Sequence, residues 1–292
     1  MIRRIGIAAA TICLACGVFA AKKPEPKALE QGKAKPVESS ITQDQAVLQL
    51  YHPNYILPFY YTQDPYQSYY AGHTPNNQAI GHTELKFQIS IKFPLVRHLY
   101  WDNLSLYAAY TQMSYWQAYN ESAFFRETNY EPEIFLQLAS DHKLGHGFTL
   151  QDVDFGAFHQ SNGRGGTLER SWNRAYVKGI FSHGDNWLFI VQPWFVFLDS
   201  SYLRYNPHMD DFLGHGQWTV AYKWHWLTVS FTSRNNAESG FSRGAEWLTA
   251  SFPFYGHLRG YVQAFSGYGQ SLAEYDHYTN AIGIGVTLND IL

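Results

Sequence analysis

Cysteine is nearly absent from this chain of 292 residues, which has two copies, Cys13 and Cys16. Both lie in an apolar run, Ile5–Phe19, that follows a pair of arginines. A short apolar run behind positive charge, closed by the small-residue site Val18-Phe19-Ala20, is typical of an export signal. We therefore predict a signal peptide over residues 1–20. The mature chain then has no cysteine, which excludes disulfides and thiolate chemistry.

Long apolar runs and net charge are also lacking. No stretch after the signal is both long enough and apolar enough to form a membrane-spanning helix. The net charge of −3 gives no reason to expect a nucleic-acid partner. Aromatic residues instead make up 17% of the chain, with 22 Tyr, 20 Phe and 9 Trp. Many aromatics and alternating stretches predict an all-β fold, a transmembrane antiparallel β-barrel.

The chain divides into three parts by composition. After the signal, residues 21–50 begin with a charged, proline-bearing stretch and predict a flexible periplasmic segment. Tyr51–Tyr61 is aromatic and extended, and we expect it to dock against the body of the protein. Residues 51–292 form the predicted barrel domain.

Regular alternation begins at Glu84–Phe93, where Leu85 and its alternate neighbours are apolar while Glu84, Lys86 and theirs are polar. Charged residues on one face cannot lie in a sandwich core, but they can line a polar barrel interior. Further strand candidates are Asn103–Gln117, Glu131–Ala139, Phe148–Asn162, Ser171–Phe181, Trp187–Leu198, Gln217–Trp226, Leu227–Arg234, Ala245–Phe254, Leu258–Ser266 and Asn280–Leu288. An even count is expected for a bacterial barrel, so we predict about 12 strands.

A polar pair stands on the apolar side of the strand Asp152–Asn162. Alternate residues point to opposite faces, so His159 and Ser161 continue the stripe of Val153 and Phe155. Polar groups on an apolar surface cost free energy unless they are partnered. A serine beside a histidine points to nucleophilic catalysis, because histidine can take the serine proton near neutral pH.

The next strand supplies a possible third member. If its charged residues point into the barrel, Asn173 points out, beside His159 and Ser161. An asparagine carbonyl oxygen can orient the imidazole without adding a charge to an apolar wall. The alternative is that His159 is an interfacial or lumen residue, and strand periodicity alone leaves this open.

Several segments resemble bacterial outer-membrane phospholipase A. They are YTQMSYWQ (Tyr110–Gln117), FRETNYEP (Phe125–Pro132), the run from Asp152 through Arg174, SGYGQSL (Ser266–Leu272) and GVTLND (Gly285–Asp290). The resemblance runs from about Tyr51 to the C-terminus. It implies a twelve-stranded barrel in the outer membrane of a Gram-negative bacterium, a calcium-dependent serine hydrolase that is active as a reversible, calcium-promoted homodimer. By match, His159 is the base, Ser161 the nucleophile and Asn173 the residue that orients the base.

The same resemblance implies a calcium site. It assigns an oxyanion-hole amide to Gly163 and calcium ligands to the main-chain carbonyl of Arg164, to position 169 and to the carbonyl of Ser122 of the partner subunit. The family has serine where this chain has Glu169. A carboxylate is a better calcium ligand than a hydroxyl, so we expect tighter calcium binding here. The alternative is that Glu169 points to solvent.

A second misplaced polar residue is Gln112. It continues the stripe of Leu104, Leu106 and Tyr110 onto the lipid-facing side, where an amide needs a hydrogen-bond partner. A symmetric dimer would supply one, and the resemblance places the matching glutamine in the dimer interface. A location at headgroup depth is the alternative.

The residues and the resemblance together predict an outer-membrane phospholipase A1/A2. It would hydrolyse the 1-acyl and 2-acyl esters of glycerophospholipids, and lysophospholipids, through a Ser-His-Asn triad. The non-enzymatic alternative is a porin or channel of the same architecture, although a barrel of about 12 strands can be filled by side chains. A structural or adhesin barrel would need longer loops than Ser200–Gly216.

Overall fold

A computed structural model describes residues 48–197, 205–206, 208–235, 239–240 and 242–291. The predicted signal peptide and most of the predicted periplasmic segment lie outside the described residues. In the described part of the chain, no helix has the length and apolarity needed to cross a membrane.

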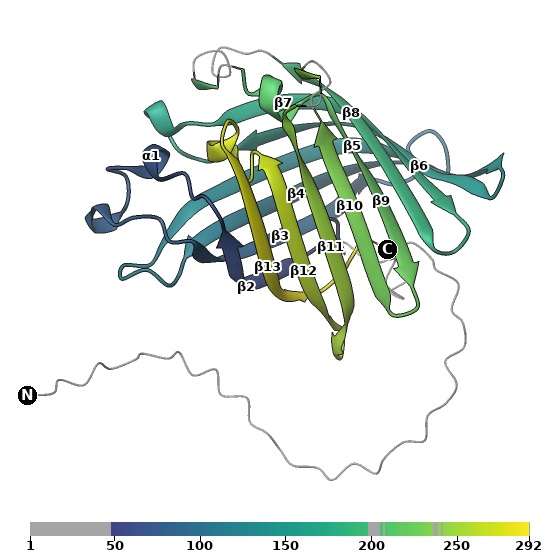
Figure 1. Cartoon of the computed structure of the whole chain (residues 1–292). Coiled ribbons are helices and arrows are strands. Elements are labelled where there is room, and N and C mark those ends of the chain that lie inside the picture. The colour runs from purple at the N-terminus through teal and green to yellow at the C-terminus, as the bar shows by residue number, and fades with distance from the viewer. Residues whose placement is uncertain (1–47, 198–204, 207, 236–238, 241, 292) are drawn as a thin grey trace, which may run out of the picture. The chain divides into compact units, whose positions relative to one another are not determined.

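Twelve antiparallel strands, β2 to β13, form a closed barrel (Figure 1). Each strand pairs with its neighbours in sequence, and β13 pairs with β2, which closes the ring. The strands are β2 Tyr55–Thr62, β3 Thr83–Val96, β4 Leu104–Gln117, β5 Phe124–Gly145, β6 Phe148–Ser161, β7 Ser171–His183, β8 Trp187–Phe197, β9 Gly216–Trp224, β10 Leu227–Asn235, β11 Gly244–Tyr255, β12 Leu258–Tyr268 and β13 Tyr278–Thr287. The predicted fold class is therefore confirmed.

The remaining elements are short. Gln49–Leu50 (β1) pairs with β3. The helical turns are α1 Gln67–Tyr70, η1 Pro75–Asn77, η2 Gly166–Leu168, α3 Asp210–Leu213 and η4 Leu272–Glu274. They occur in the connections between strands, and η2 lies in the connection from β6 to β7.

Two expectations about the strands need correction. The segment Tyr51–Tyr61, expected to dock against the body of the protein, is mostly part of the barrel wall, because Tyr55–Thr62 is itself a strand, hydrogen-bonded to β3 and β13. Its Pro58 falls where the register shifts on both sides, so the missing N–H does not interrupt a regular ladder. The strand expected at Glu131–Ala139 extends over Phe124–Gly145, because its first residues pair with β4 and its last residues pair with β6.

The alternation of side chains explains the barrel. Glu84, Lys86 and Ser90 of β3 point inward and are fully buried, while Ile89 of the same strand is about half exposed. The interior satisfies its charges in pairs, such as Lys178 with Asp154 at 2.7 Å. On β3, apolar side chains thus face out and polar ones face in, as a barrel surrounded by lipid requires. Aromatic side chains such as Phe135 and Trp172 are also buried and fill the interior beside the charged groups.

The barrel interior keeps a cavity of about 780 Å³ that polar and apolar side chains line together. Tyr51, between β1 and β2, reaches into it. Its hydroxyl donates to Glu133 at 3.3 Å and accepts from Lys178 at 2.8 Å. Its ring stacks on Phe135, with centroids 5.5 Å apart. The N-terminal end of the barrel chain thus occupies part of the interior.

Candidate active site

The register of β6 and β7 brings the predicted triad to one place on the outer wall. His159 stands directly opposite Asn173, and Ser161 stands directly opposite Ser171. His159 is exposed, and Asn173 and Ser161 are half-buried. Their inward neighbours Phe158 and Trp172 are buried, so the face assigned from the alternation is confirmed.

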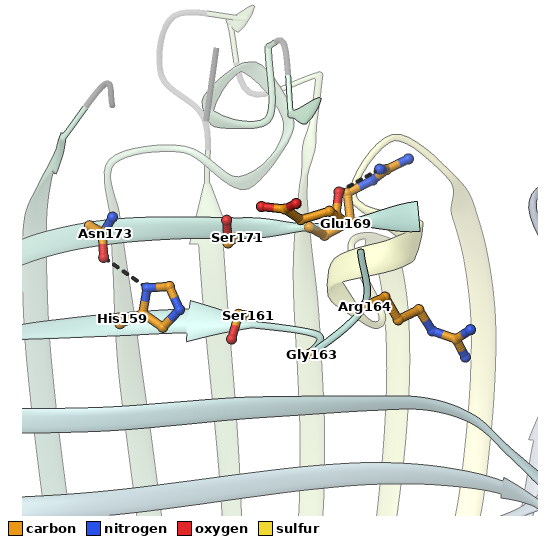
Figure 2. A pocket seen from close by; sticks show the side chains of 8 residues that line it. His159, Ser161, Gly163, Arg164, Glu169, Ser171 and Asn173 are labelled. Atoms are coloured by element: carbon orange, nitrogen blue, oxygen red, sulfur yellow. Dashed lines mark hydrogen bonds between the residues drawn. The ribbon is translucent and has the colours of Figure 1, made fainter. Parts of the chain in front are cut away.

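His159 is held by Asn173. The imidazole Nδ1 lies 2.8 Å from Asn173 Oδ1, and the amide oxygen accepts this hydrogen bond (Figure 2). With the proton on Nδ1, the bond fixes the ring and leaves Nε2 able to accept a proton. Figure 2 shows the ring nitrogen that does not contact Asn173 on the side of Ser161. The arrangement suits a base flanked by its orienting residue and a nucleophile.

A pocket of about 360 Å³ opens beside this trio. It is lined by His159, Ser161, Gly163, Arg164, Glu169, Arg170, Ser171 and Asn173. A single pocket therefore brings together the predicted triad, the predicted oxyanion-hole residue and the calcium ligands predicted for one protomer.

Gly163 follows the end of β6 with φ +64, a conformation that favours glycine. It is exposed, two residues beyond Ser161. An added Cβ would lie 2.9 Å from the Tyr130 ring. Backbone conformation and space thus both require glycine at the position predicted for the oxyanion hole.

Side chains tie down the loop from Asn162 to Arg170. Asn162 Oδ1 accepts from the amides of Arg164 at 3.3 Å and Arg170 at 3.0 Å, and its Nδ2 donates to the Leu168 carbonyl at 2.9 Å. Tyr69 of α1 donates to the same carbonyl at 2.9 Å. Burial raises the pKa of Tyr69 to about 12, so the phenol stays protonated as a donor.

Arg164 and Glu169 extend in different directions. Figure 2 shows the Arg164 side chain leading away from the pocket, whereas the Glu169 carboxylate lies on the side of Ser171. Glu169 is half-buried and lines the pocket. The expectation that it could ligate an ion there remains a prediction, and the alternative of a solvent-directed side chain is not favoured by this placement.

The oxygens around the pocket fit calcium. Calcium prefers carboxylate and carbonyl oxygens, and the pocket offers the Glu169 carboxylate together with the Ser171 hydroxyl and main-chain carbonyls. Within the described residues, no three His, Cys, Asp or Glu side chains gather as a metal-binding group. One protomer thus supplies a partial ligand set, which suits an ion completed by water and a partner.

Ser122 lies in the connection between β4 and β5 and does not line this pocket. Its carbonyl accepts from Gln78 Nε2 at 2.5 Å, and its hydroxyl accepts from Asn76 at 3.2 Å. It therefore does not meet Arg164 and Glu169 of its own protomer. Its assignment to the pocket of a partner subunit stays a prediction.

Gln112 lies half-buried on the outward face of β4. Its Oε1 accepts from the Tyr110 hydroxyl at 2.9 Å, and its Nε2 donates to Ser114 at 3.2 Å. The amide thus has partners in its own strand, so a lack of partners no longer argues for a dimer. The polar ladder on the lipid face remains, and its role in an interface stays a prediction.

Sequence reasoning missed Tyr130, Ser171 and Asn162. Tyr130 is the register partner of Ser161 on β5, and Ser171 is its partner on β7. Strand pairing is the signal that would have found both, once the register was known. Asn162 was placed correctly on the inward face, but its function as the anchor of the loop depends on the turn geometry.

Comparison with known proteins gives a consistent result. Residues 33–288 match the sequence model of the phospholipase A1 family. Phospholipase A1 of Proteus vulgaris is 42% identical over 243 residues, which cover 82% of this chain and 81% of that protein. Phospholipase A1 of Escherichia coli K12 is 42% identical over 210 residues, covering 71% and 70%.

The chain belongs to the phospholipase A1 family. A crystal structure of the outer-membrane phospholipase dimer of Salmonella typhi with bound calcium superposes with a TM-score of 0.79 at 36% identity, covering 86% of this chain and 95% of that one. The Escherichia coli outer-membrane phospholipase A also gives 0.79 at 37% identity, covering 85% and 100%. Membership of the phospholipase A1 family confirms the resemblance and does not favour the porin alternative.

Proposed function

We propose that this protein hydrolyses acyl ester bonds of membrane phospholipids with Ser161 as nucleophile, His159 as base and Asn173 as the residue that orients the base. The substrates would be the 1-acyl and 2-acyl esters of glycerophospholipids and lysophospholipids. The hydrogen bond from His159 to Asn173, on the lipid-facing wall beside Ser161, carries the proposal. Family membership supports it, because relatives 42% identical are phospholipases A1.

The proposed reaction has two halves. Ser161 Oγ attacks the ester carbonyl carbon while its proton passes to His159 Nε2. When the tetrahedral intermediate collapses, the bond to the leaving alkoxide breaks, and the same proton goes to that oxygen and releases the lyso-lipid. Water then attacks the acyl-enzyme carbonyl carbon and gives a proton to His159. The bond from that carbon to Ser161 Oγ breaks, His159 returns the proton to Oγ, and the fatty acid leaves.

The developing oxyanion needs donors that are already in place. The Gly163 amide is the proposed donor, because Gly163 lies two residues beyond Ser161 and lines the same pocket. Calcium, when bound, would add positive charge that polarises the scissile carbonyl. In this chain, the Arg164 carbonyl and the Glu169 carboxylate would hold it, completed by the carbonyl of Ser122 of the partner subunit.

The Salmonella typhi relative forms a dimer with bound calcium. We propose the same reversible, calcium-promoted homodimer here, with Gln112 in the interface. A monomer would then lack one calcium ligand, so association would couple to activity. The remaining proposals are the location in the outer membrane, the signal peptide at residues 1–20, the periplasmic segment at residues 21–50 and the enzymatic barrel at residues 51–292.

The test is Ser161→Ala in the full mature chain, folded in detergent and assayed for fatty-acid release from mixed phospholipid micelles with calcium or with chelator. The wild type should hydrolyse lipid only with calcium. The variant should lose activity by roughly 10⁴-fold or more while keeping the folded barrel. Full activity in Ser161→Ala would overturn the mechanism. Channel conductance in planar bilayers without any hydrolysis by the wild type would support the porin alternative.

A further inference from the structure

The Arg164 side chain ties the loop of the active site to buried groups of β5. Its Nη2 donates to the main-chain carbonyl of Arg126 at 2.5 Å, and its Nε lies 3.4 Å from Glu127 Oε2. The Glu127 side chain is fully buried, whereas that of Arg164 is 28% exposed. The guanidinium of this loop residue therefore forms an ion pair with a buried carboxylate.

Glu127 depends on this cation. Its Oε1 accepts from Asn129 Nδ2 at 3.1 Å. Among the described residues, Arg164 is the basic residue within ion-pair distance of the carboxylate. Removing one member of a buried pair leaves an uncompensated charge, which is costly. The ion pair with Glu127 therefore strongly favours the position that the Arg164 side chain has in the structure.

The other contact of Arg164 is equally fixed. Arg126, whose carbonyl it meets, extends its own guanidinium to Glu84 at 2.7 Å and to Glu274 at 2.9 Å. All three of these side chains are at most 2% exposed. The point on β5 that anchors the loop is held in turn by β3 and by η4, so it cannot shift without disturbing a buried ion network.

The anchored residue carries the proposed calcium ligand. The Arg164 carbonyl is that ligand, and the Gly163 amide immediately before it is the proposed oxyanion donor. The outer part of the loop is fastened separately, through Asn162 and Tyr69. The pair of Arg164 and Glu127 fixes the same loop from within the barrel, close to the two backbone groups whose position matters.

We propose that Glu127 is a positioning residue for calcium binding and for the oxyanion hole. It does not line the pocket and contacts no reacting atom. Its carboxylate acts through the Arg164 side chain, which sets the main chain at Gly163 and Arg164. Partners of metal ligands outside the coordination sphere commonly change metal affinity by about 10- to 100-fold. This inference rests on the proposed function, because it assigns a support to that calcium site.

The test compares Glu127→Gln with Asp154→Asn in the full mature chain. Asp154 is an equally buried carboxylate paired with Lys178, so its variant controls for losing an interior ion pair away from the loop. Two quantities are measured on folded protein: the calcium concentration for half-maximal lipid hydrolysis, and calcium binding by titration calorimetry. We expect Glu127→Gln to raise the calcium concentration for half-maximal hydrolysis by about tenfold or more, and to weaken calcium binding by a similar factor. Its activity at saturating calcium should fall less, and Asp154→Asn should match the wild type.

A second variant covers failure of Glu127→Gln to fold. Arg164→Gln keeps the main-chain carbonyl and removes only the tether, so it should weaken calcium binding to a similar degree. Calcium affinity equal to that of the wild type in either folded variant would overturn the inference. Absence of calcium-dependent hydrolysis in the wild type would instead refute the proposed function, so the two failures are distinguishable.

Discussion

The ring of Tyr130 lies against Gly163 so closely that an added Cβ would come within 2.9 Å of it. Gly163 also has φ +64, where side chains other than hydrogen are strained. Tyr130 is at the same time the register partner of Ser161. Tyr130 thus pairs through its backbone with the proposed nucleophile, and its ring borders the proposed oxyanion donor.

Gly163→Ala should therefore lose roughly 10²-fold or more in kcat, the effect of removing one oxyanion donor, because the loop must move to place the methyl group. Heat-modifiable gel migration would check that the barrel folds. Gly165→Ala is a matched control, since nothing lies within 4 Å of its added Cβ and its φ is not positive. Equal losses in both variants would argue for a general effect on the loop rather than for the contact with Tyr130.

Asn173→Ala should reduce kcat by about 10- to 100-fold and change KM little. The Nδ1 of His159 loses the acceptor at 2.8 Å that fixes its ring and tautomer. Asn173→Asp retains an acceptor oxygen and should keep more activity than Asn173→Ala. The comparison of initial rates decides the point, and two variants of equal activity would contradict the proposed orienting function.

Glu169→Ser should weaken calcium binding, because it replaces a carboxylate at the pocket edge by a hydroxyl. The measurement is a calcium titration of hydrolysis and, separately, of binding heat. Glu169→Gln separates charge from length. If Glu169→Ser binds calcium as tightly as the wild type, Glu169 is not a ligand.

Gln112→Ala should lower the yield of calcium-promoted dimers in crosslinking. The substitution removes the central member of the ladder that joins Tyr110 to Ser114 on the outer wall. Leu248→Ala is a suitable control, because Leu248 faces outward on β11 and is 51% exposed. Undiminished dimers in Gln112→Ala would remove this residue from the proposed interface.

Much of the fold follows from the sequence, because a period of two is a local property. Polar Glu84 and Lys86 alternating with apolar neighbours are enough to assign an inward and an outward face. For the same reason, His159, Ser161 and Asn173 could be placed on one wall before any register was known. The length of β5 and the strand at Tyr55–Thr62 could not be predicted in this way. Charged residues towards the ends of β5, and a proline at a register shift in β2, weaken the local pattern.

The candidate site likewise has features that the sequence determines and features that depend on the tertiary structure. By itself, the sequence determined which residue types are available and which face each one occupies, since both depend on neighbours along the chain. Only the tertiary structure decided that Tyr130 borders Gly163, and that Arg164 turns inward to Glu127. These relationships join residues on different strands and loops. They depend on register, loop conformation and the need of a buried carboxylate for a counter-charge, none of which is encoded in the local period.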